Sequence, residues 1–225
     1  ARILVLAGFT EAEAAALVAY RLTPAVWDAA QVRWLAAAVT AGGGEALPIH
    51  LKLETGMGRL GATAEQLPAL EAALRAAPQL RVEAVFSHLA ASEAADAVPS
   101  ERQRDRLLAL AAGRRWHLLN SEAALRFAPR AGWGGMLARI GLALYGYSAQ
   151  PQHAAHLRPA LTWKAHVVGV KQLPAGHGVG YGPAFITPRP MRVATLAVGY
   201  ADGYRRDFSP GAQVRLDGVS GPVIG

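Results

Sequence analysis

A short apolar stretch followed by a readable helix start recurs along the first two thirds of this 225-residue chain. The stretches that predict strands are residues 3–6, 25–27, 49–53, 82–86, 116–119 and 137–145. Capping pairs predict helices that start at Thr10 with Glu13, Asp28 with Gln31, Thr63 with Gln66, and Ser100 with Gln103, and a short helix is predicted over 121–127. Strands that alternate with helices form parallel βαβ units with right-handed crossovers.

The predicted strands are apolar throughout, which indicates that helices cover both faces of the sheet. A doubly wound sheet and a (β/α) barrel both satisfy that pattern. No G-x-G-x-x-G follows the first strand, which disfavours a dinucleotide-binding sheet. A barrel has eight units in about 250 residues. The six units counted over residues 3–146 therefore predict an α/β fold, a partial (β/α)8 TIM-type barrel.

The alternation of predicted strands and helices ends after residue 147. Pro151 and Pro159 lie in a predicted linker, and β-type runs follow at residues 161–173, 191–200, 214–216 and 222–224. Glycine, proline and aspartate turns separate these runs, without a helical period. We therefore expect a barrel domain over residues 1–150 and a partial all-β domain over residues 151–225.

Composition excludes several classes of protein. The chain has no cysteine, which rules out disulfides and cysteine-ligated metals, and we expect no metal site. No apolar run is long enough to span a bilayer and no signal peptide is visible, so we expect a cytoplasmic protein without a membrane partner. The net charge of +7 comes from scattered arginines, which a GC-rich genome explains better than a nucleic-acid partner.

Polar and cationic residues lie at the ends of four consecutive predicted strands, where parallel α/β folds collect functional groups. These residues are Lys52, Arg59, Ser87, His88, Asn120, Ser121 and Arg139. Ser121 opens a helix, where a phosphate or a simple N-cap would both fit. His88 could equally be a hydrogen-bonded core histidine. Lys52 and Arg139 interrupt apolar strands, so each needs an acceptor or a modification. Together these groups predict an anion-binding site.

Six stretches, in order and spacing, resemble alanine racemase, the fold-type III pyridoxal-phosphate enzyme family. They are HLKLETGMGRLG (50–61), VFSHLAAS (85–92), HLLNSEAALRF (117–127), ARIGLALYGYS (138–148), LPAGHGVGYGPAF (173–185) and RVATLAVGYADGYRR (192–206). The resemblance covers nearly the whole chain. It implies pyridoxal 5'-phosphate as the cofactor and a homodimer whose active sites are shared between subunits.

The resemblance implies that Tyr181 is the catalytic tyrosine, which reaches the partner subunit's active site. The surrounding glycines then form a loop that presents the phenol, in preference to a phosphate cradle. A free tyrosine has a pKa of about 10, so nearby cations must lower it before it can act as a base at neutral pH. His88 is implied to lie close to the cofactor ring and to the hydrogen bonds of this tyrosine.

The remaining roles are likewise implied by the resemblance. Arg139 would face the pyridine nitrogen with support from His117, and the phosphate would contact Ser121 and the backbone N–H groups of Gly141 and Leu142. The substrate residues would be Arg59, Tyr200 and Arg206, together with Glu93, which replaces the usual aspartate. Lys52 matches a lysine that is carbamylated in some members, where the new carboxylate pairs with Arg59.

The implied reaction interconverts L-alanine and D-alanine through two bases, the tyrosine and a Schiff-base lysine, and supplies D-alanine for bacterial peptidoglycan. The V-K-A-N-A-Y-G-type motif of that lysine has no match here, and the chain's lysines are Lys52, Lys164 and Lys171. We therefore expect an internal part of such an enzyme, lacking two N-terminal units and the last β strands, and inactive alone.

Three alternatives remain open at this point. A broad-specificity amino-acid racemase shares the motifs and differs in its substrate range. A non-catalytic pyridoxal-phosphate-binding homologue would explain the absent lysine, although Tyr181, Arg59 and Arg139 are all retained. A purely structural barrel would not bind pyridoxal phosphate.

Overall fold

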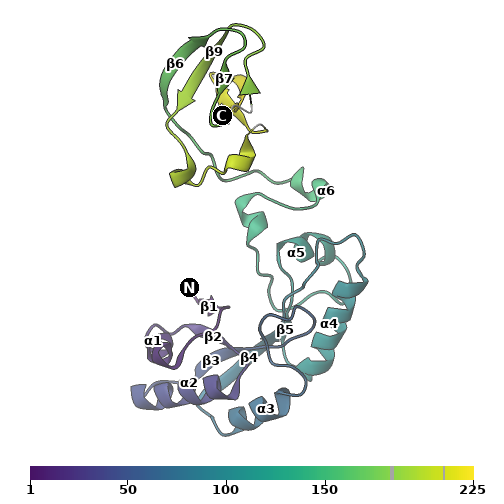
Figure 1. Cartoon of the computed structure of the whole chain (residues 1–225). Helices are drawn as coiled ribbons and strands as arrows, with labels where there is room; N and C mark the ends of the chain where they lie inside the picture. The colour runs from purple at the N-terminus through teal and green to yellow at the C-terminus, as the bar shows by residue number, and fades with distance from the viewer. Residues whose placement is uncertain (183–184, 210) are drawn as a thin grey trace. The chain divides into compact units, whose positions relative to one another are not determined.

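The computed structural model describes residues 1–182, 185–209 and 211–225. Pro183 and Ala184, which belong to one of the quoted motifs, lie outside the described residues, as does Pro210. The chain divides into two compact units, Ala1–Ala160 and Leu161–Gly225, shown from purple to yellow along the chain in Figure 1.

The first unit contains one parallel sheet of five strands in the order β1-β2-β3-β4-β5. The strands are β1 (Leu4–Val5), β2 (Thr23–Val26), β3 (Leu47–Lys52), β4 (Leu80–Phe86) and β5 (Trp116–His117). Each strand pairs in parallel with the next one in the sequence. A doubly wound sheet would reverse its order at a switch point, whereas consecutive order is that of a barrel wall. The predicted partial barrel is confirmed.

The helices of this unit follow the strands (Figure 1). They are the 3-10 helix η1 (Glu11–Glu13), α1 (Ala14–Ala19), α2 (Ala29–Gly42), α3 (Leu67–Arg75), α4 (Val98–Ala111) and α5 (Ser121–Phe127). At the predicted start of α2, Asp28 accepts a hydrogen bond from the Ala30 N–H, while Gln31 accepts one from the Asp28 N–H. Gly43, in the left-handed region at φ 59°, ends this helix.

The predicted start of α4 at Ser100 and Gln103 is wrong. The helix begins at Val98, whose N–H donates to Asp96 Oδ1 at 2.9 Å. Ser100 and Gln103 are buried inside the helix, and Gln103 bonds to loops that follow β3 and β4. Ser100 and Gln103 have the spacing of a capping box, but their side chains make tertiary contacts and do not cap the helix.

The predicted sixth strand, residues 137–145, is also not formed. The N–H groups of Met136 and Arg139 donate to the carbonyls of Trp116 and Leu119 at 2.7 and 2.9 Å, so the chain starts to run along β5. The Ser121 hydroxyl then accepts from the Gly141 N–H at 2.9 Å. This contact turns the chain into the 3-10 helix η2 (Leu142–Tyr145) before a strand can form.

The core of the first unit lies between the sheet and its helices. All four residues of β2 are buried, and side chains on both faces of β3 and β4 are enclosed. Phe127 and Trp133 close one side, with their rings stacked 4.2 Å apart. Burial of a large apolar side chain contributes roughly 1.5–3 kcal/mol, which stabilises the sheet whose strand ends carry the polar groups. The short helix α6 (Pro151–Ala154) follows η2 near the end of the unit.

The second unit is built from antiparallel strand pairs, which confirms the predicted β fold. The pairs are β6 (Val167–Leu173) with β9 (Met191–Leu196), β7 (Gly178–Val179) with β8 (Phe185–Ile186), and β10 (Gln213–Leu216) with β11 (Val219–Pro222). Two 3-10 helices, η3 (Tyr200–Asp202) and η4 (Arg206–Phe208), follow β9. Across the described parts of both units, no helix has the length and apolar character needed to cross a bilayer.

Candidate active site

The carboxyl ends of β3, β4 and β5 place three side chains in one row on the same face of the sheet. Lys52 pairs in register with Phe86, and Phe86 pairs with His117. The Phe86 and His117 rings stack with their centres 4.6 Å apart. Phe86 is thus the apolar floor around which the charged groups of the site are arranged.

Arg139 is held above this floor by carbonyl groups from two strand ends. Its Nη2 donates to the Ser87 carbonyl at 2.7 Å and to the Leu118 carbonyl at 3.2 Å, and its Nη1 donates to His117 Nδ1. The guanidinium lies 5.2 Å from the centre of the Phe86 ring. Burial lowers the pKa of Arg139 to about 10, so the group is still a cation at neutral pH. The acceptors that the sequence demanded for this arginine are present.

Lys52 is 6% exposed, and its Nζ lies 5.7 Å from the Trp27 ring centre and 5.6 Å from that of Phe86. Burial lowers the pKa of Lys52, and the charges of Arg59 and Arg139 lower it further, while Glu54 opposes them. The neutral amine is therefore more accessible here than at an exposed lysine.

His88 lies among the same cations. Its Nδ1 is 3.4 Å from Arg139 Nη2. Burial and the charges of Arg139, Arg59 and Lys52 lower the pKa of His88 to about 4, so the ring is neutral at physiological pH. The structure thus brings together five of the predicted residues, which are Lys52, Arg59, His88, His117 and Arg139. The three cations among them favour an anionic ligand.

The loop that carries Arg59 is organised by a residue that the sequence analysis did not single out. The Glu54 carboxylate accepts from three successive backbone N–H groups, those of Gly56, Met57 at 2.7 Å and Gly58 at 2.8 Å. Gly61, at φ 129°, closes the loop so tightly that a Cβ would lie 2.7 Å from the Glu54 nitrogen. A carboxylate two residues before a G-x-G was the available signal for this turn.

Ser121 is not the cap of α5. Asn120 is the cap, since its side chain accepts from the Ala123 N–H at 3.0 Å. The Ser121 hydroxyl instead accepts from the N–H groups of Gly141 and Ala143 at 2.9 and 3.2 Å. A hydroxyl and backbone N–H donors at the start of η2 therefore converge at one point, which is a suitable arrangement for a phosphate. Leu142, the first residue of η2, lies between the two N–H donors.

Gln103, which the sequence analysis assigned to a helix start, instead contacts two loops of the site. Its side-chain amide donates to the His88 carbonyl at 3.0 Å and accepts from the Ala90 N–H at 2.8 Å. It also donates to Thr55 Oγ1, which shares a 2.7 Å hydrogen bond with Ser87 Oγ. These bonds tie the loops after β3 and β4 to α4 and hold the His88 segment in place.

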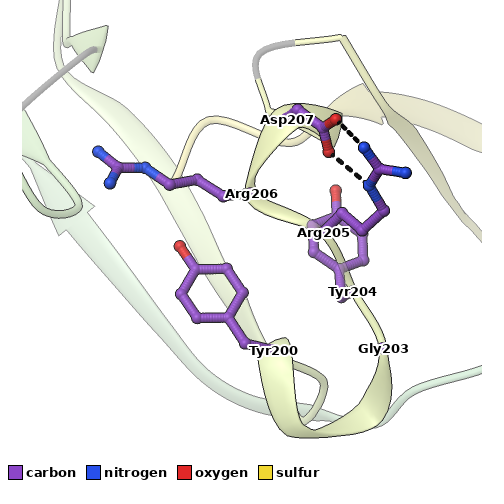
Figure 2. A pocket seen from close by; sticks show the side chains of 6 residues that line it. All are labelled: Tyr200, Gly203, Tyr204, Arg205, Arg206 and Asp207. Atoms are coloured by element: carbon purple, nitrogen blue, oxygen red, sulfur yellow. Dashed lines mark hydrogen bonds and ion pairs between the residues drawn. The ribbon is translucent and has the colours of Figure 1, made fainter.

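The second unit carries the other predicted residues. Tyr181 is 88% exposed and lies between Gly180 and Gly182, both at positive φ. Tyr200 and Arg206 line an open pocket of about 480 Å³. Figure 2 shows them on one side of the loop, with the ion pair of Arg205 and Asp207 on the other.

Two family models cover the chain almost end to end. The model described as "Alanine racemase, N-terminal domain" matches residues 1–149, and that described as "Alanine racemase, C-terminal domain" matches residues 160–225. The chain belongs to the alanine racemase family. The family accounts for both units, the barrel wall and the β domain.

Individual members of the alanine racemase family agree with this assignment. An alanine racemase from Methylacidiphilum infernorum is 34% identical over 99% of this chain. The solved structure of the alanine racemase from Streptomyces coelicolor A3(2) has a TM-score of 0.91 and 30% identity over the whole chain. A structure from Bartonella henselae, described as an alanine racemase with covalently bound pyridoxal phosphate, has a TM-score of 0.79 at 24% identity and supports the fold.

The chain spans only part of these alanine racemases. It covers 57% of the Methylacidiphilum protein and 62% of the Streptomyces chain. What the complete relatives do is therefore carried to this chain only as a proposal.

Proposed function

We propose that this chain is part of a pyridoxal-phosphate-dependent enzyme that interconverts L-alanine and D-alanine. The observation that carries the proposal is the cation cluster of Lys52, Arg59 and Arg139 around the neutral His88, at the strand ends of an alanine racemase barrel wall. The D-alanine would supply peptidoglycan synthesis in a bacterial cytoplasm.

The residues of the first unit fit this cofactor. The Ser121 hydroxyl and the Gly141 N–H, 2.9 Å apart, would hold the phosphate together with the N–H of Leu142. Arg139 would face the pyridine nitrogen, with His117 as its support. When bound, pyridoxal phosphate supplies an electron sink that stabilises negative charge at the substrate α-carbon. Arg139 would keep its own proton, so the ring nitrogen would stay largely unprotonated and the sink would remain weak.

Proton transfer would use the phenol of Tyr181 on the L face of the substrate. The neighbouring glycines leave this side chain exposed. His88, neutral at physiological pH, would accept a hydrogen bond beside it. The base for the D face is not assigned to a side chain of this chain.

Substrate binding would rest on charge. Arg59, presented by the loop that Glu54 organises, would bind the carboxylate of alanine and the cofactor's phenolic oxygen. Tyr200 and Arg206, on the rim of the pocket in the second unit, would line the path of the substrate. Purified complete protein should racemise L-alanine and D-alanine with pyridoxal phosphate. Failure with alanine but turnover of other amino acids would favour a broad-specificity racemase.

Lys52 is expected to carry a carbamate. Its lowered pKa favours the neutral amine, whose nitrogen would form a bond to carbon dioxide with loss of one proton, and the new carboxylate would pair with Arg59. Protein equilibrated with ¹³C-bicarbonate should show one carbamate ¹³C signal. That signal should vanish in Lys52→Met and persist in Lys171→Met, which alters an exposed lysine of β6. Persistence of the signal in Lys52→Met would refute the modification.

A homodimer with shared sites predicts complementation between two inactive variants. Tyr181→Phe and Arg139→Lys alter different units, so a mixed dimer would contain one site free of both changes. Unfolding the two variants together and refolding them should restore about a quarter of wild-type activity, since half the dimers are mixed and each has one intact site. Each variant refolded alone is the control. No recovery, with dimers verified by ultracentrifugation, would place both residues in the same subunit's site.

A further inference from the structure

Behind Arg139, two imidazole rings and a carboxylate follow one another through the interior of the first unit. His117 Nδ1 contacts Arg139, and His117 Nε2 lies 2.8 Å from His50 Nδ1. His50 Nε2 in turn lies 3.5 Å from Glu83 Oε2. His117 and His50 are 0% and 2% exposed, so bulk water does not compete for these contacts. The series links three strands, β5, β3 and β4.

The direction of these hydrogen bonds can be inferred by starting from the arginine. A guanidinium has only N–H donors, so His117 Nδ1 must accept. A neutral imidazole carries one proton, which then lies on His117 Nε2 and is donated to His50 Nδ1. By the same reasoning the proton of His50 lies on Nε2 and points to Glu83. Every ring in the series therefore has one tautomer that satisfies both of its neighbours.

Charge and burial agree with two neutral rings. Burial, Arg139 and His50 lower the pKa of His117 to about 3, and burial lowers that of His50 although Glu83 opposes it. The pKa of Glu83 is lowered, chiefly by the Arg2 guanidinium that donates to Oε1 at 2.7 Å. The series thus begins at a cation and ends at an anion, with neutral donors aligned between them.

A β-bulge brings Glu83 to the end of this series. Ile49 pairs with Val82, whereas the next residue, His50, pairs with Ala84. Glu83 is the extra residue of β4, and a bulge re-aims the side chain it carries. His50 Nε2 and Glu83 Oε2 are both buried, and neither has a standard hydrogen bond to another described residue. Their 3.5 Å separation makes each the available partner of the other.

We propose that His50 and Glu83 are positioning residues, which hold His117 in the Nε2–H tautomer and thereby orient the Arg139 guanidinium toward the cofactor ring. They act through His117 and do not contact the cofactor. An imidazole whose far nitrogen has no acceptor can rotate or change tautomer, and Nδ1–H would point a donor at the arginine. The functional consequence rests on the proposed racemase activity, while the tautomers themselves do not.

The first test is the protonation of the two rings in the complete protein, labelled with ¹⁵N-histidine. Long-range ¹H–¹⁵N correlation spectra at pH 7 should show His117 and His50 both as Nε2–H tautomers. Resonances are assigned by the loss of each signal in single histidine variants. A proton on His117 Nδ1, or a doubly protonated ring, would overturn the proposal whatever the activity.

The second test distinguishes the effect of the hydrogen-bond acceptor of Glu83 from the effect of its negative charge. Glu83→Gln retains an oxygen for His50 Nε2–H and should keep both tautomers and a kcat within about twofold of wild type. Glu83→Leu removes the acceptor and should give a mixture of His50 tautomers, with kcat lowered roughly tenfold, the lower end of the effect seen when the outer-shell partner of a metal-binding histidine is lost. Unchanged tautomers in Glu83→Leu would refute the role of Glu83.

Two variants of His50 test its role in the same way. His50→Asn keeps a short acceptor near the position of Nδ1, whereas His50→Leu removes it. The Asn variant should therefore retain most of the kcat that the Leu variant loses. His153→Asn, which alters a histidine outside the series, controls for the loss of an imidazole.

A wild-type protein without racemase activity would refute the proposed function, but the tautomers found by NMR would still be valid. Equal kcat in the Asn and Leu variants would refute positioning by His50.

Discussion

Replacing Tyr181 with phenylalanine is expected to lower kcat for alanine racemisation by about 10²- to 10⁴-fold, the usual contribution of a positioned general acid or base. The change removes one oxygen from a side chain that is 88% exposed, so folding should be unaffected. Cofactor content should also be unchanged, because the groups assigned to the cofactor lie in the first unit. Activity in both directions and absorbance of the bound cofactor are the measurements.

The matched control is Tyr20→Phe, which removes the same oxygen from another exposed tyrosine, at the end of α1. Its kcat should equal that of wild type. A Tyr181→Phe enzyme that keeps more than about a tenth of wild-type kcat would remove Tyr181 from the role of base.

Replacing Arg139 with lysine should affect both stability and activity. The single ammonium group of lysine cannot reproduce the planar guanidinium, whose two terminal nitrogens donate to Ser87, Leu118 and His117. At least one buried acceptor therefore loses its donor. We expect a loss of about 1–3 kcal/mol in the free energy of unfolding, measured by urea denaturation. We also expect kcat to fall by roughly 10²-fold, since the cation would no longer be positioned at the pyridine nitrogen.

Arg126 offers a control of the same chemistry outside the proposed machinery. Its guanidinium donates to the carbonyls of Ser92, Ala94 and Ala95. Arg126→Lys should reduce stability by a comparable amount, about 1–3 kcal/mol, while kcat stays within roughly threefold of wild type. If both variants lost the same fraction of kcat, the effect of Arg139→Lys would be one of stability alone.

Features that depend on neighbours in sequence were predictable. The start of α2 at Asp28 and the span of α5 follow from local hydrogen-bond chemistry, and the parallel sheet follows from apolar stretches between helices. The need of Arg139 for acceptors also followed from a charge within an apolar stretch. The acceptors themselves, carbonyls at the ends of β4 and β5, could be named only once the strands were paired.

Features that depend on distant partners were missed or misread. Residues 137–145 have the composition of a strand, but a hydroxyl 20 residues earlier turns the chain at Gly141. Gln103 matched a capping pattern, but its partners lie in loops after other strands. Nothing local marks Glu83 as inward-facing, because the bulge exists only in the pairing of β3 with β4.

The hydrogen bonds of Arg139 also bear on the order in which the first unit folds. Val85 of β4 pairs with Trp116 of β5 across 31 residues, whereas the bond from Arg139 to the Ser87 carbonyl spans 52 residues. Contacts between distant segments form late, because the closure of the intervening chain must be compensated first. We therefore expect Arg139 to dock after β4 and β5 have paired. A nascent chain that already has its sheet would still lack the anchored guanidinium, so capture of cofactor would report that folding of this unit is complete.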